Sequence, residues 1–367
     1  MELSLPEFPW DALRPFAERA TAHPDGIVDL SVGSPVDRTP MVIAHALAAA
    51  ADAHAYPQTA GTPELRRAIA HWFARRRGVA SLGDANVLPT IGSKELIAGM
   101  ALWLGLGPGD VVVQPRLAYP TYAVGAALAG ATVHTGDDPA RWPKKTKLVW
   151  VNSPGNPDGR VLGVDALAAA VARARVLGAV IASDECYAEL AWDGTAGTTP
   201  SILDARVIHG VRTDVVAVYS LSKQSNLAGY RAGLVAGCSS VIGRLLAVRR
   251  NLGLIPPAPV QAAMVAALGD DRHVKVQRER YRARRAKLLP ALEAAGYRID
   301  GSEAGLYLWA TRGTDAWAAV ADLADLGILV APGTFYGDDR SRHVRIAITA
   351  TDERIDAAIG RLATASN

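Results

Sequence analysis

Three short apolar segments in the middle of the chain constrain its fold more than any other feature. Residues 147–151, 179–183 and 215–219 are runs of mostly aliphatic residues, many of them β-branched, and they alternate with Ala-, Leu- and Arg-rich segments of helical character. Runs that are apolar throughout are typical of strands buried on both faces of a sheet, and helices between them favour parallel pairing. Residues 111–113 and 233–236 are further candidate strands. The sequence therefore predicts an α/β fold with a mostly parallel sheet.

The pattern changes after the proline-rich run 255–259. A long charged helix is expected over roughly 260–295, and the segments after it alternate between short strands and one further helix, at 297–299, 305–309, 314–326 and 343–348. Strands that return on one another with helices between them predict a smaller α+β domain. The proline-rich run is the candidate hinge between the two domains.

Composition argues against several functional classes. The net charge is only +3 over 367 residues and no long basic run occurs, so neither a nucleic-acid partner nor a membrane surface is expected. No apolar run is long enough to span a bilayer and the first residues lack a signal-peptide pattern, which predicts a cytoplasmic protein. Cys186 and Cys238 are too few for a disulfide framework, and the eight histidines show no metal-ligand spacing, so no metal is expected.

Polar residues follow each of the three apolar segments. The first leads into 152–156 (NSPGN), the second into 184–187 (DECY) and the third into 220–223 (SLSK). Taken singly, each is compatible with a turn or a helix cap. In open α/β sheets, however, ligands bind beyond the carboxyl ends of the strands. A lysine there can form a Schiff base with an aldehyde, and hydroxyls with the guanidinium of Arg231 can hold a phosphate, which are the attachment needs of pyridoxal 5'-phosphate (PLP).

The Asn-Pro, Asp-x-x-Tyr and Ser-x-Ser-Lys motifs, in this order and followed by Arg231, resemble those of fold-type I PLP enzymes, specifically the class I/II aminotransferases. The resemblance runs nearly end to end. It implies the fold-type I PLP-dependent transferase fold, with a mostly parallel seven-stranded sheet flanked by helices and a smaller α+β domain. It also implies a large PLP-binding domain at 39–259 and a small domain formed by 1–38 and 260–367.

The resemblance assigns a role to each strand-end residue. Lys223 would be the catalytic residue, which carries the cofactor and then moves a proton between the substrate and the cofactor. Asp184 would pair with the pyridinium nitrogen and keep the ring protonated, so that it can accept electrons. Asn156 and Tyr187 would hydrogen-bond the phenolic oxygen of PLP.

The phosphate would lie between Arg231 and the hydroxyls of Ser220 and Ser222. Ser93 and Lys94 belong to the same expected set, because they open a helix whose first N–H groups favour a phosphate.

Four further residues complete the predicted site by resemblance. Tyr119 would stack on the pyridine ring, and Tyr56 would reach the phosphate of the other subunit, which implies a homodimer with shared sites. Gly33 would let the backbone approach the substrate. Arg345 would bind the substrate α-carboxylate, and Asn156 would contact the substrate as well as the cofactor.

The predicted reaction is amino transfer between an amino acid and a 2-oxo acid. A PLP-dependent C–S lyase acting by elimination stays open as an alternative on the same fold. A PLP-responsive transcription regulator is not favoured, because the Gly33 motif comes too early for a preceding DNA-binding domain.

The segments 5–11, 92–96 and 184–190 most resemble those of actinobacterial succinyldiaminopimelate aminotransferases. That resemblance implies glutamate as amino donor and N-succinyl-2-amino-6-oxopimelate as acceptor, in lysine and diaminopimelate biosynthesis. Aspartate, alanine and aromatic amino acids stay open as substrates.

Overall fold

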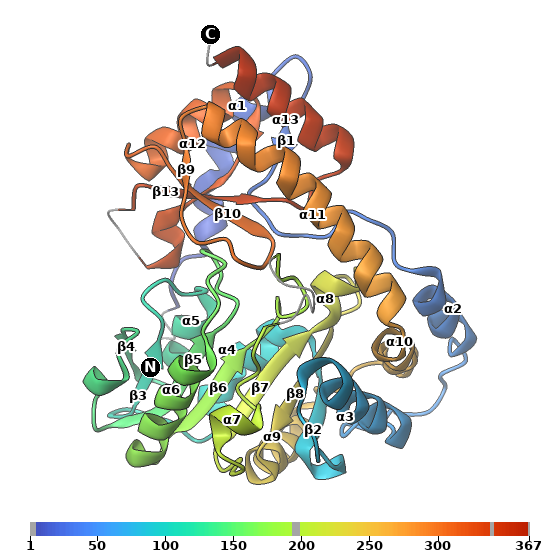
Figure 1. The fold of residues 1–367 in the computed structure, drawn as a ribbon. Coiled ribbons are helices and arrows are strands. Elements are labelled where there is room, and N and C mark those ends of the chain that lie inside the picture. The colour runs from blue at the N-terminus through green and yellow to red at the C-terminus, as the bar shows by residue number, and fades with distance from the viewer. Residues whose placement is uncertain (1–4, 193–198, 338–340, 366–367) are drawn as a thin grey trace.

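The computed structural model describes residues 5–192, 199–337 and 341–365, which form a large and a small lobe (Figure 1). The large lobe is built on a seven-stranded sheet in the order β2-β8-β7-β6-β5-β3-β4. Its strands are β2 (Val87–Ile91), β3 (Val111–Gln114), β4 (Thr132–Thr135), β5 (Thr146–Asn152), β6 (Val180–Asp184), β7 (Val215–Ser220) and β8 (Ala232–Gly237). From β4 to β7 all neighbours are parallel, and β8 runs antiparallel to both β7 and β2. The mostly parallel seven-stranded sheet is therefore confirmed.

Both faces of this sheet are covered, as the apolar strands predicted. Along β5, Val149 and Val151 enter one hydrophobic core, whereas Leu148 and Trp150 enter another on the opposite face. The helices of the large lobe are α2 (Met41–Ala49), α3 (Pro63–Arg77), α4 (Gly92–Trp103), α5 (Thr121–Leu128), α6 (Val164–Leu177), α7 (Ala205–Ile208), α8 (Leu221–Gln224), α9 (Ser239–Leu252) and α10 (Ala258–Gly269). Residues of α3, α6 and α10 share the first core, and residues of α4, α5 and α9 share the second.

The small lobe has its own hydrophobic core around a four-stranded antiparallel sheet in the order β12-β13-β10-β9. Its strands are β9 (Arg298–Ile299), β10 (Tyr307–Thr311), β12 (Ala331–Pro332) and β13 (His343–Ala347). A separate parallel pair joins β1 (Val28–Asp29) to β11 (Ile328–Leu329), and so brings the N-terminal segment into this lobe. The surrounding helices are α1 (Arg14–Thr21), α11 (Asp271–Ala294), α12 (Ala316–Asp325) and α13 (Asp352–Ala365). Two short 3-10 turns, Pro9–Leu13 and Gly333–Tyr336, contact elements of this lobe, and two others, Asp84–Asn86 and Pro139–Arg141, contact helices of the large lobe.

The expected single helix over 260–295 is wrong, because it is broken at Asp270. This residue has extended backbone angles (φ −116°, ψ 108°), and its carboxylate accepts hydrogen bonds from the N–H groups of Arg272 and His273. An aspartate in this arrangement caps a new helix, which the apolar periodicity does not reveal. The helix before the break, α10, packs in the first core of the large lobe, and α11 crosses to the small lobe (Figure 1).

The proline-rich run 255–259 thus leads into α10, a helix of the large lobe. The connection from the large lobe to the small lobe is made by α11. The division at residues 38/39 and 259/260 stays a prediction. From the packing of α10 we propose that the second boundary lies near Gly269.

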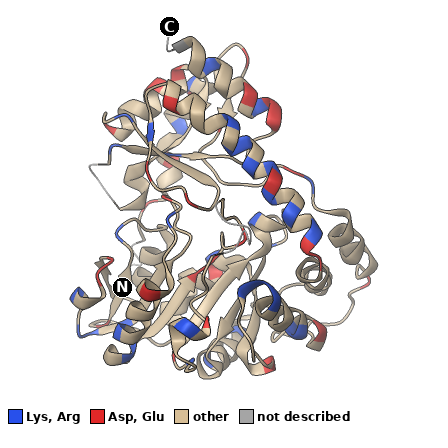
Figure 2. Ribbon diagram, in the orientation of Figure 1, with Lys and Arg blue, Asp and Glu red and all other residues tan. Residues whose placement is uncertain are grey.

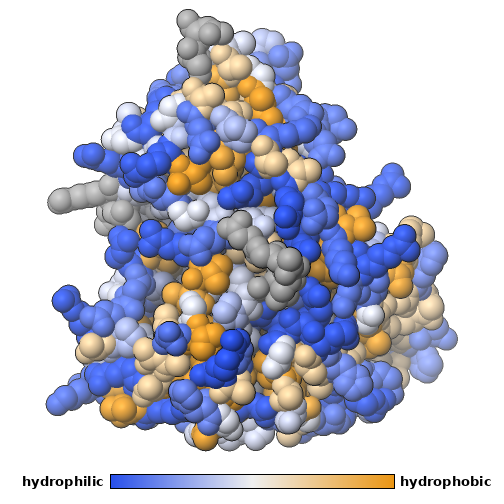
Figure 3. Space-filling model, viewed as in Figure 1, coloured by the Kyte–Doolittle hydropathy of each residue, from blue (hydrophilic) through white to orange (hydrophobic). Residues whose placement is uncertain are grey.

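The surface is polar and of mixed charge. Lys and Arg recur along α11 with acidic residues among them, and both signs are interspersed over the two lobes in this view (Figure 2). On the face in Figure 3 hydrophobic residues lie in separate groups among hydrophilic ones. Among the helices of the described ranges, none has the length and apolar character needed to cross a membrane.

Candidate active site

A cavity of about 920 Å³ opens at the carboxyl ends of β5, β6 and β7, and residues of both lobes line it. The parallel register places Asn152 beside Asp184, so the polar segments that follow β5 and β6 are neighbours. Most of the predicted site residues line this cavity, namely Gly33, Ser93, Lys94, Tyr119, Asn156, Asp184, Tyr187, Ser220, Ser222, Lys223, Arg231 and Arg345. Tyr56 does not line it and is 99% exposed.

Lys223 lies on the single-turn helix α8 directly after β7. Its Nζ donates a hydrogen bond to the carbonyl oxygen of Gly33, which lies in the N-terminal segment. Burial lowers the pKa of Lys223 below its ordinary value, and the nearby cations Arg345 and Arg231 lower it further. A lowered pKa enlarges the fraction of neutral amine, which is the form that attacks an aldehyde.

Asp184 ends β6 with its carboxyl group buried in the floor of the cavity. The Tyr122 hydroxyl donates to Oδ2 (3.0 Å), and the Cys186 N–H donates to Oδ1 (3.2 Å). Burial raises the pKa of Asp184, although these hydrogen bonds oppose the rise. Neither described donor is a cation, so a positively charged group bound in the cavity would find a buried carboxylate ready to pair with it.

Arg345 comes from β13 of the small lobe and is only 2% exposed. Its Nη1 donates to Asn156 Oδ1 (2.9 Å) and its Nη2 to the Ser31 carbonyl (2.6 Å), whereas Nε has no hydrogen-bond partner among the described residues. The guanidinium carbon lies 3.9 Å from the centre of the Tyr307 ring. The described partners of this buried cation are neutral oxygens and aromatic rings, so the site is prepared for an anion such as a carboxylate.

Tyr307 is a cavity residue that the sequence motifs did not indicate. Its hydroxyl lies 3.0 Å from that of Tyr187, and its ring packs under Arg345. Burial by itself would raise the pKa of Tyr307, but Arg345 and Lys223 bring it below the ordinary value. Tyr307 also explains Gly33, because a Cβ at residue 33 would collide with the Tyr307 hydroxyl.

Tyr122 was likewise missed, and it supports Asp184 as described above. Tyr119, which was predicted, lines the cavity next to it with its ring edge-on to that of Tyr122. Burial raises the pKa of Tyr119 to about 12, so its hydroxyl stays protonated at neutral pH. Periodicity gave no sign that Tyr122 reaches Asp184, because the two residues are 62 positions apart.

One end of the cavity has the character of an anion site. Gly92 opens α4 with φ +73°, and a Cβ there would collide with the guanidinium of Arg231. Ser220 Oγ donates to Ser222 Oγ (2.8 Å) on the same side. A helix N-terminus, a guanidinium and two hydroxyls together suit a phosphate group.

Lys94 is placed differently from this group. It is exposed, and its Nζ lies 5.3 Å from the centre of the Phe8 ring, in the N-terminal segment that covers the cavity. A phosphate contact by Lys94 therefore stays a prediction.

Comparison with known proteins identifies the family. Residues 25–362 match the family model described as aminotransferase class I and II. The chain belongs to this family. The class I and II aminotransferases use PLP and act on amino acids and oxo acids, so the predicted family and cofactor are confirmed.

Two relatives are similar over nearly the whole chain. The 4-dedimethylamino-4-oxo-anhydrotetracycline transaminase OxyQ of Streptomyces rimosus is 57% identical, over 98% of this chain and 99% of the relative. The protein named "Probable aminotransferase Rv1178" of Mycobacterium tuberculosis is 56% identical, over 98% of this chain and 85% of the relative.

Solved structures agree with the fold. An aminotransferase of Neisseria meningitidis superposes with a TM-score of 0.89 at 31% identity, covering 99% and 98% of the two chains. The N-succinyldiaminopimelate aminotransferase of M. tuberculosis superposes with a TM-score of 0.85 at 29% identity, covering 96% and 98%. The aminotransferase is thus similar to enzymes of more than one substrate class.

The cavity fits PLP on grounds independent of these comparisons. The Asp184 carboxylate is buried without a described cationic partner, where the protonated ring nitrogen would supply one. The phosphate would take the anion site at Gly92 and Arg231, and Lys223 lines the same cavity.

Proposed function

We propose that this aminotransferase moves an amino group between glutamate and a 2-oxo acid, with N-succinyl-2-amino-6-oxopimelate as the acceptor. The observation that carries the general assignment is the convergence of Lys223, Asp184 and the unpaired cation Arg345 on one cavity between the lobes. A second subunit is part of the proposal, because Tyr56 is fully exposed in this chain and would act in the site of its partner.

Each residue has a separate task in this proposal. PLP, when bound, supplies an aldehyde for the amino group and a ring that accepts electrons. Asp184 would hold a proton on the ring nitrogen, and Lys223 Nζ would move a proton between the substrate α-carbon and C4' of the cofactor. Arg345 orients the substrate by its α-carboxylate, which exchanges the neutral oxygens of Ser31 and Asn156 for a charged partner.

The choice of acceptor rests on the size of the cavity and on a cation, Lys94, at its exposed edge. A volume of about 920 Å³ is large enough for an extended acceptor beside the cofactor. Lys94, over the ring of Phe8, would offer a cation to a distal carboxylate of the succinylated acceptor. The similarity to the M. tuberculosis N-succinyldiaminopimelate aminotransferase supports the same choice.

A second candidate acceptor is a large cyclic ketone. The 57% identity to OxyQ favours it, and so do the apolar side chains of Leu5, Phe8, Trp10 and Phe335 around the cavity. An apolar lining accommodates a fused ring system without leaving polar groups unpaired.

An acceptor screen tests both candidates. PLP-loaded protein is first converted with glutamate, which should replace the visible absorption band by the ultraviolet band of pyridoxamine phosphate. The 2-oxo acids of aspartate, alanine and aromatic amino acids, the succinylated keto-pimelate and a polycyclic ketone are then compared for recovery of the visible band. Fastest recovery with the succinylated compound supports the proposal, and release of ammonia and pyruvate from cysteine or its conjugates would instead identify a C–S lyase.

Substitution of Arg345 by glutamine is expected to raise the KM for glutamate about 100-fold, because two charge-assisted hydrogen bonds to the α-carboxylate are lost. The preference for glutamate over 4-aminobutyrate, which lacks the α-carboxylate, should fall by a similar factor. The exposed Arg67→Gln serves as control. A variant that keeps the full preference would show that Arg345 does not bind this carboxylate.

Substitution of Tyr56 by phenylalanine is expected to weaken PLP binding roughly 10-fold, because one hydrogen bond to the phosphate is removed from each site. Sedimentation should show a dimer for wild type and variant alike. A monomeric wild type with full activity would contradict the shared site.

A further inference from the structure

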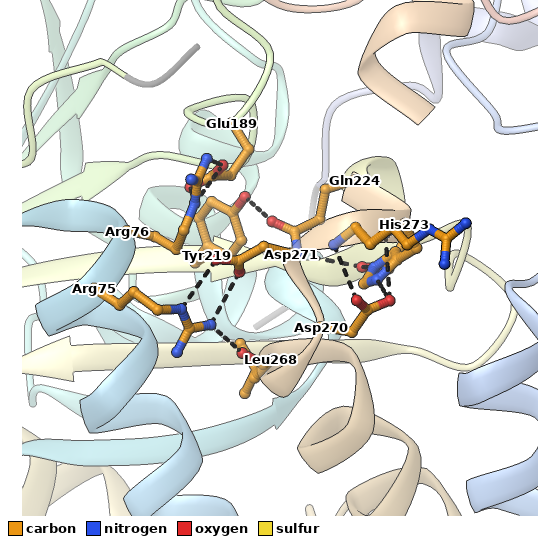
Figure 4. A network of polar contacts seen from close by, with 11 residues as sticks. Arg75, Arg76, Glu189, Tyr219, Gln224, Leu268, Asp270, Asp271 and His273 are labelled. Atoms are coloured by element: carbon orange, nitrogen blue, oxygen red, sulfur yellow. Dashed lines mark hydrogen bonds and ion pairs between the residues drawn. The ribbon is translucent and has the colours of Figure 1, made fainter. Parts of the chain in front are cut away.

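Buried polar side chains form a hydrogen-bonded series from Tyr219 through Gln224 to His273, next to Lys223 in the sequence (Figure 4). Tyr219 Oη donates to Gln224 Oε1, and Gln224 Nε2 donates to Ser225 Oγ (3.2 Å). Ser225 Oγ lies 2.8 Å from His273 Nε2, and His273 Nδ1 lies 3.0 Å from Asp270 Oδ2. All but Asp270 are buried, so these groups depend on one another for hydrogen bonds.

Each side chain in this hydrogen-bonded series donates to the next one, from Tyr219 to His273 and on to Asp270. The Gln224 amide nitrogen can only donate, so Ser225 Oγ accepts from it and has its own proton free for His273 Nε2. The Asp270 carboxylate can only accept, so the imidazole proton is on Nδ1. With Ser225 donating to Nε2, His273 is neutral and carries its proton on Nδ1, and burial, which lowers its pKa, favours this form.

His273 belongs to a line of residues on one face of α11. His273, Gln277 and Tyr281 follow one another at four-residue spacing, which places them one turn apart on the same side. Gln277 Oε1 accepts a hydrogen bond from Asn226 Nδ2 (2.9 Å), and the Tyr281 hydroxyl donates to the carbonyl oxygen of Lys223 (3.3 Å). The helix that crosses between the lobes thus holds Lys223 and the turn that follows it.

We propose that His273 positions Lys223. It does so by holding the side chain of Ser225, which lies at the end of α8. Ser225 N–H closes α8 by donating to the Leu221 carbonyl, so a fixed Ser225 side chain fixes the turn that carries Lys223. This inference rests on the proposed role of Lys223 as the catalytic lysine. It adds a link between that lysine and the interlobe helix.

Burial favours the neutral form of His273, whereas the acidic groups nearby favour the protonated form. Asp270 and Asp271 face it from the start of its own helix, and α8 presents only the neutral Gln224 and Ser225. Burial lowers the pKa of His273 below its ordinary value, against the opposing effect of Asp270.

Arg75 of α3 engages Asp271 (3.0 Å) and the Leu268 carbonyl (2.7 Å), whereas Arg76 pairs with Glu189 (Figure 4). Arg75 therefore balances the charge of Asp271 and holds the α10–α11 junction against α3.

Protonation of His273 would break the order of this hydrogen-bonded series. Nε2 would then carry a proton directed at Ser225 Oγ, which would accept from both Gln224 and His273 and would lose Nε2 as the acceptor of its own proton. The hydrogen-bonded series from Tyr219 to Asp270 is intact while the imidazole is neutral. It is disrupted as the pH falls through the lowered pKa of His273. We expect this loss to appear as an acid limb in the activity profile.

The test compares His273→Ala, Ser225→Ala and the double variant with the control His71→Ala, an exposed histidine of α3. In PLP-loaded protein His273→Ala should lower kcat about 10-fold with the KM for glutamate changed less than twofold, and the pH midpoint of the visible absorption band should move by about half a unit or more. The double variant should be no worse than the more affected single variant, because the two residues act through one hydrogen bond.

His273→Gln provides a rescue, because its amide oxygen can accept the Ser225 proton. It should recover most of the lost kcat and remove the acid limb. Equal behaviour of His273→Ala and His71→Ala in kcat and band titration would overturn the proposal. Ser225→Ala removes a single hydroxyl and gives the same test if His273→Ala does not fold.

A readout without PLP separates this inference from the proposed function. In the apo-protein, ¹⁵N spectra of the imidazoles should contain a neutral Nδ1–H form that disappears in His273→Ala and changes in Ser225→Ala. A signal for an Nε2–H tautomer at His273 would contradict the hydrogen-bonded series. If the wild type shows this signal but binds no PLP, the proposed function fails and the structural link stands.

Discussion

Replacement of Lys223 by alanine is expected to lower amino transfer from glutamate by a factor of about 10⁴ or more. The variant loses both the amine that bonds the cofactor and the base that moves the α-proton. PLP should still bind, because Asp184, Arg231 and the first turn of α4 are unchanged. Borohydride reduction of wild type should yield one labelled peptide containing Lys223, and the variant should yield none.

Lys287→Ala is the matched control for this experiment. Lys287 lies on the surface of α11, where its ammonium pairs with Asp356 (2.8 Å), and its removal leaves the cavity unchanged. It should keep wild-type turnover and labelling. A covalent PLP adduct retained in Lys223→Ala would place the attachment on another lysine and would end the central assignment.

Substitution of Asp184 by asparagine is expected to lower kcat about 1,000-fold, because the ring nitrogen loses the carboxylate that keeps it protonated. Asparagine has nearly the same shape: its Oδ1 can accept from the Cys186 N–H, and its Nδ2 can donate to the Tyr122 hydroxyl, which can also act as an acceptor, so the loss mainly reflects charge. Tyr122→Phe removes one of these hydrogen bonds and keeps the carboxylate, and it should cost much less. Stopped-flow decay of the visible band on mixing with glutamate measures all three proteins.

Asp184→Asn lowers kcat in the PLP-loaded enzyme, but it is expected to stabilise the folded apo-protein. Burial raises the pKa of Asp184, so the folded chain holds this proton more tightly than the unfolded chain. The stability gained from the proton is fully present below the ordinary carboxyl pKa, and it is lost as the pH rises through the raised pKa. At a pH above this raised pKa the apo wild type carries a buried carboxylate without a described cationic partner.

Asp184→Asn should consequently raise the free energy of unfolding of the apo-protein near pH 7. The gain should shrink as the pH falls, and should vanish below the ordinary carboxyl pKa, where the wild-type carboxyl is protonated in both states. Urea unfolding at several pH values measures this difference. A variant less stable than wild type across the range would show that the carboxylate is already compensated in the apo-protein.

The sequence revealed the large sheet better than it revealed the boundaries of the helices. The strands around Val149, Ile181 and Val216 were recognisable because strands buried on both faces are apolar at every position. The break at Asp270 was missed, since a cap depends on the backbone angles of one residue and a charged helix masks it. The Pro-rich run leads into α10, and its role as a hinge stays a prediction.

Some residues of the candidate site were recognisable from the sequence, and others were not. Lys223, Asp184 and Asn156 were found because each follows a strand, and neighbouring parallel strands bring their ends together in register. Tyr307 and Tyr122 were missed, because each is an aromatic residue in an apolar segment, where a core role is the ordinary interpretation.

The sequence by itself determined the α/β class, the cofactor and the residues at the carboxyl ends of the strands, because these depend on local pattern and on register. Only the tertiary structure decided how the small lobe completes the site. Arg345, Tyr307 and His273 reach their partners across separations of 189, 120 and 48 residues. Such contacts depend on how α11 and the two cores pack, and packing over those separations leaves no spacing in the sequence from which it could be inferred.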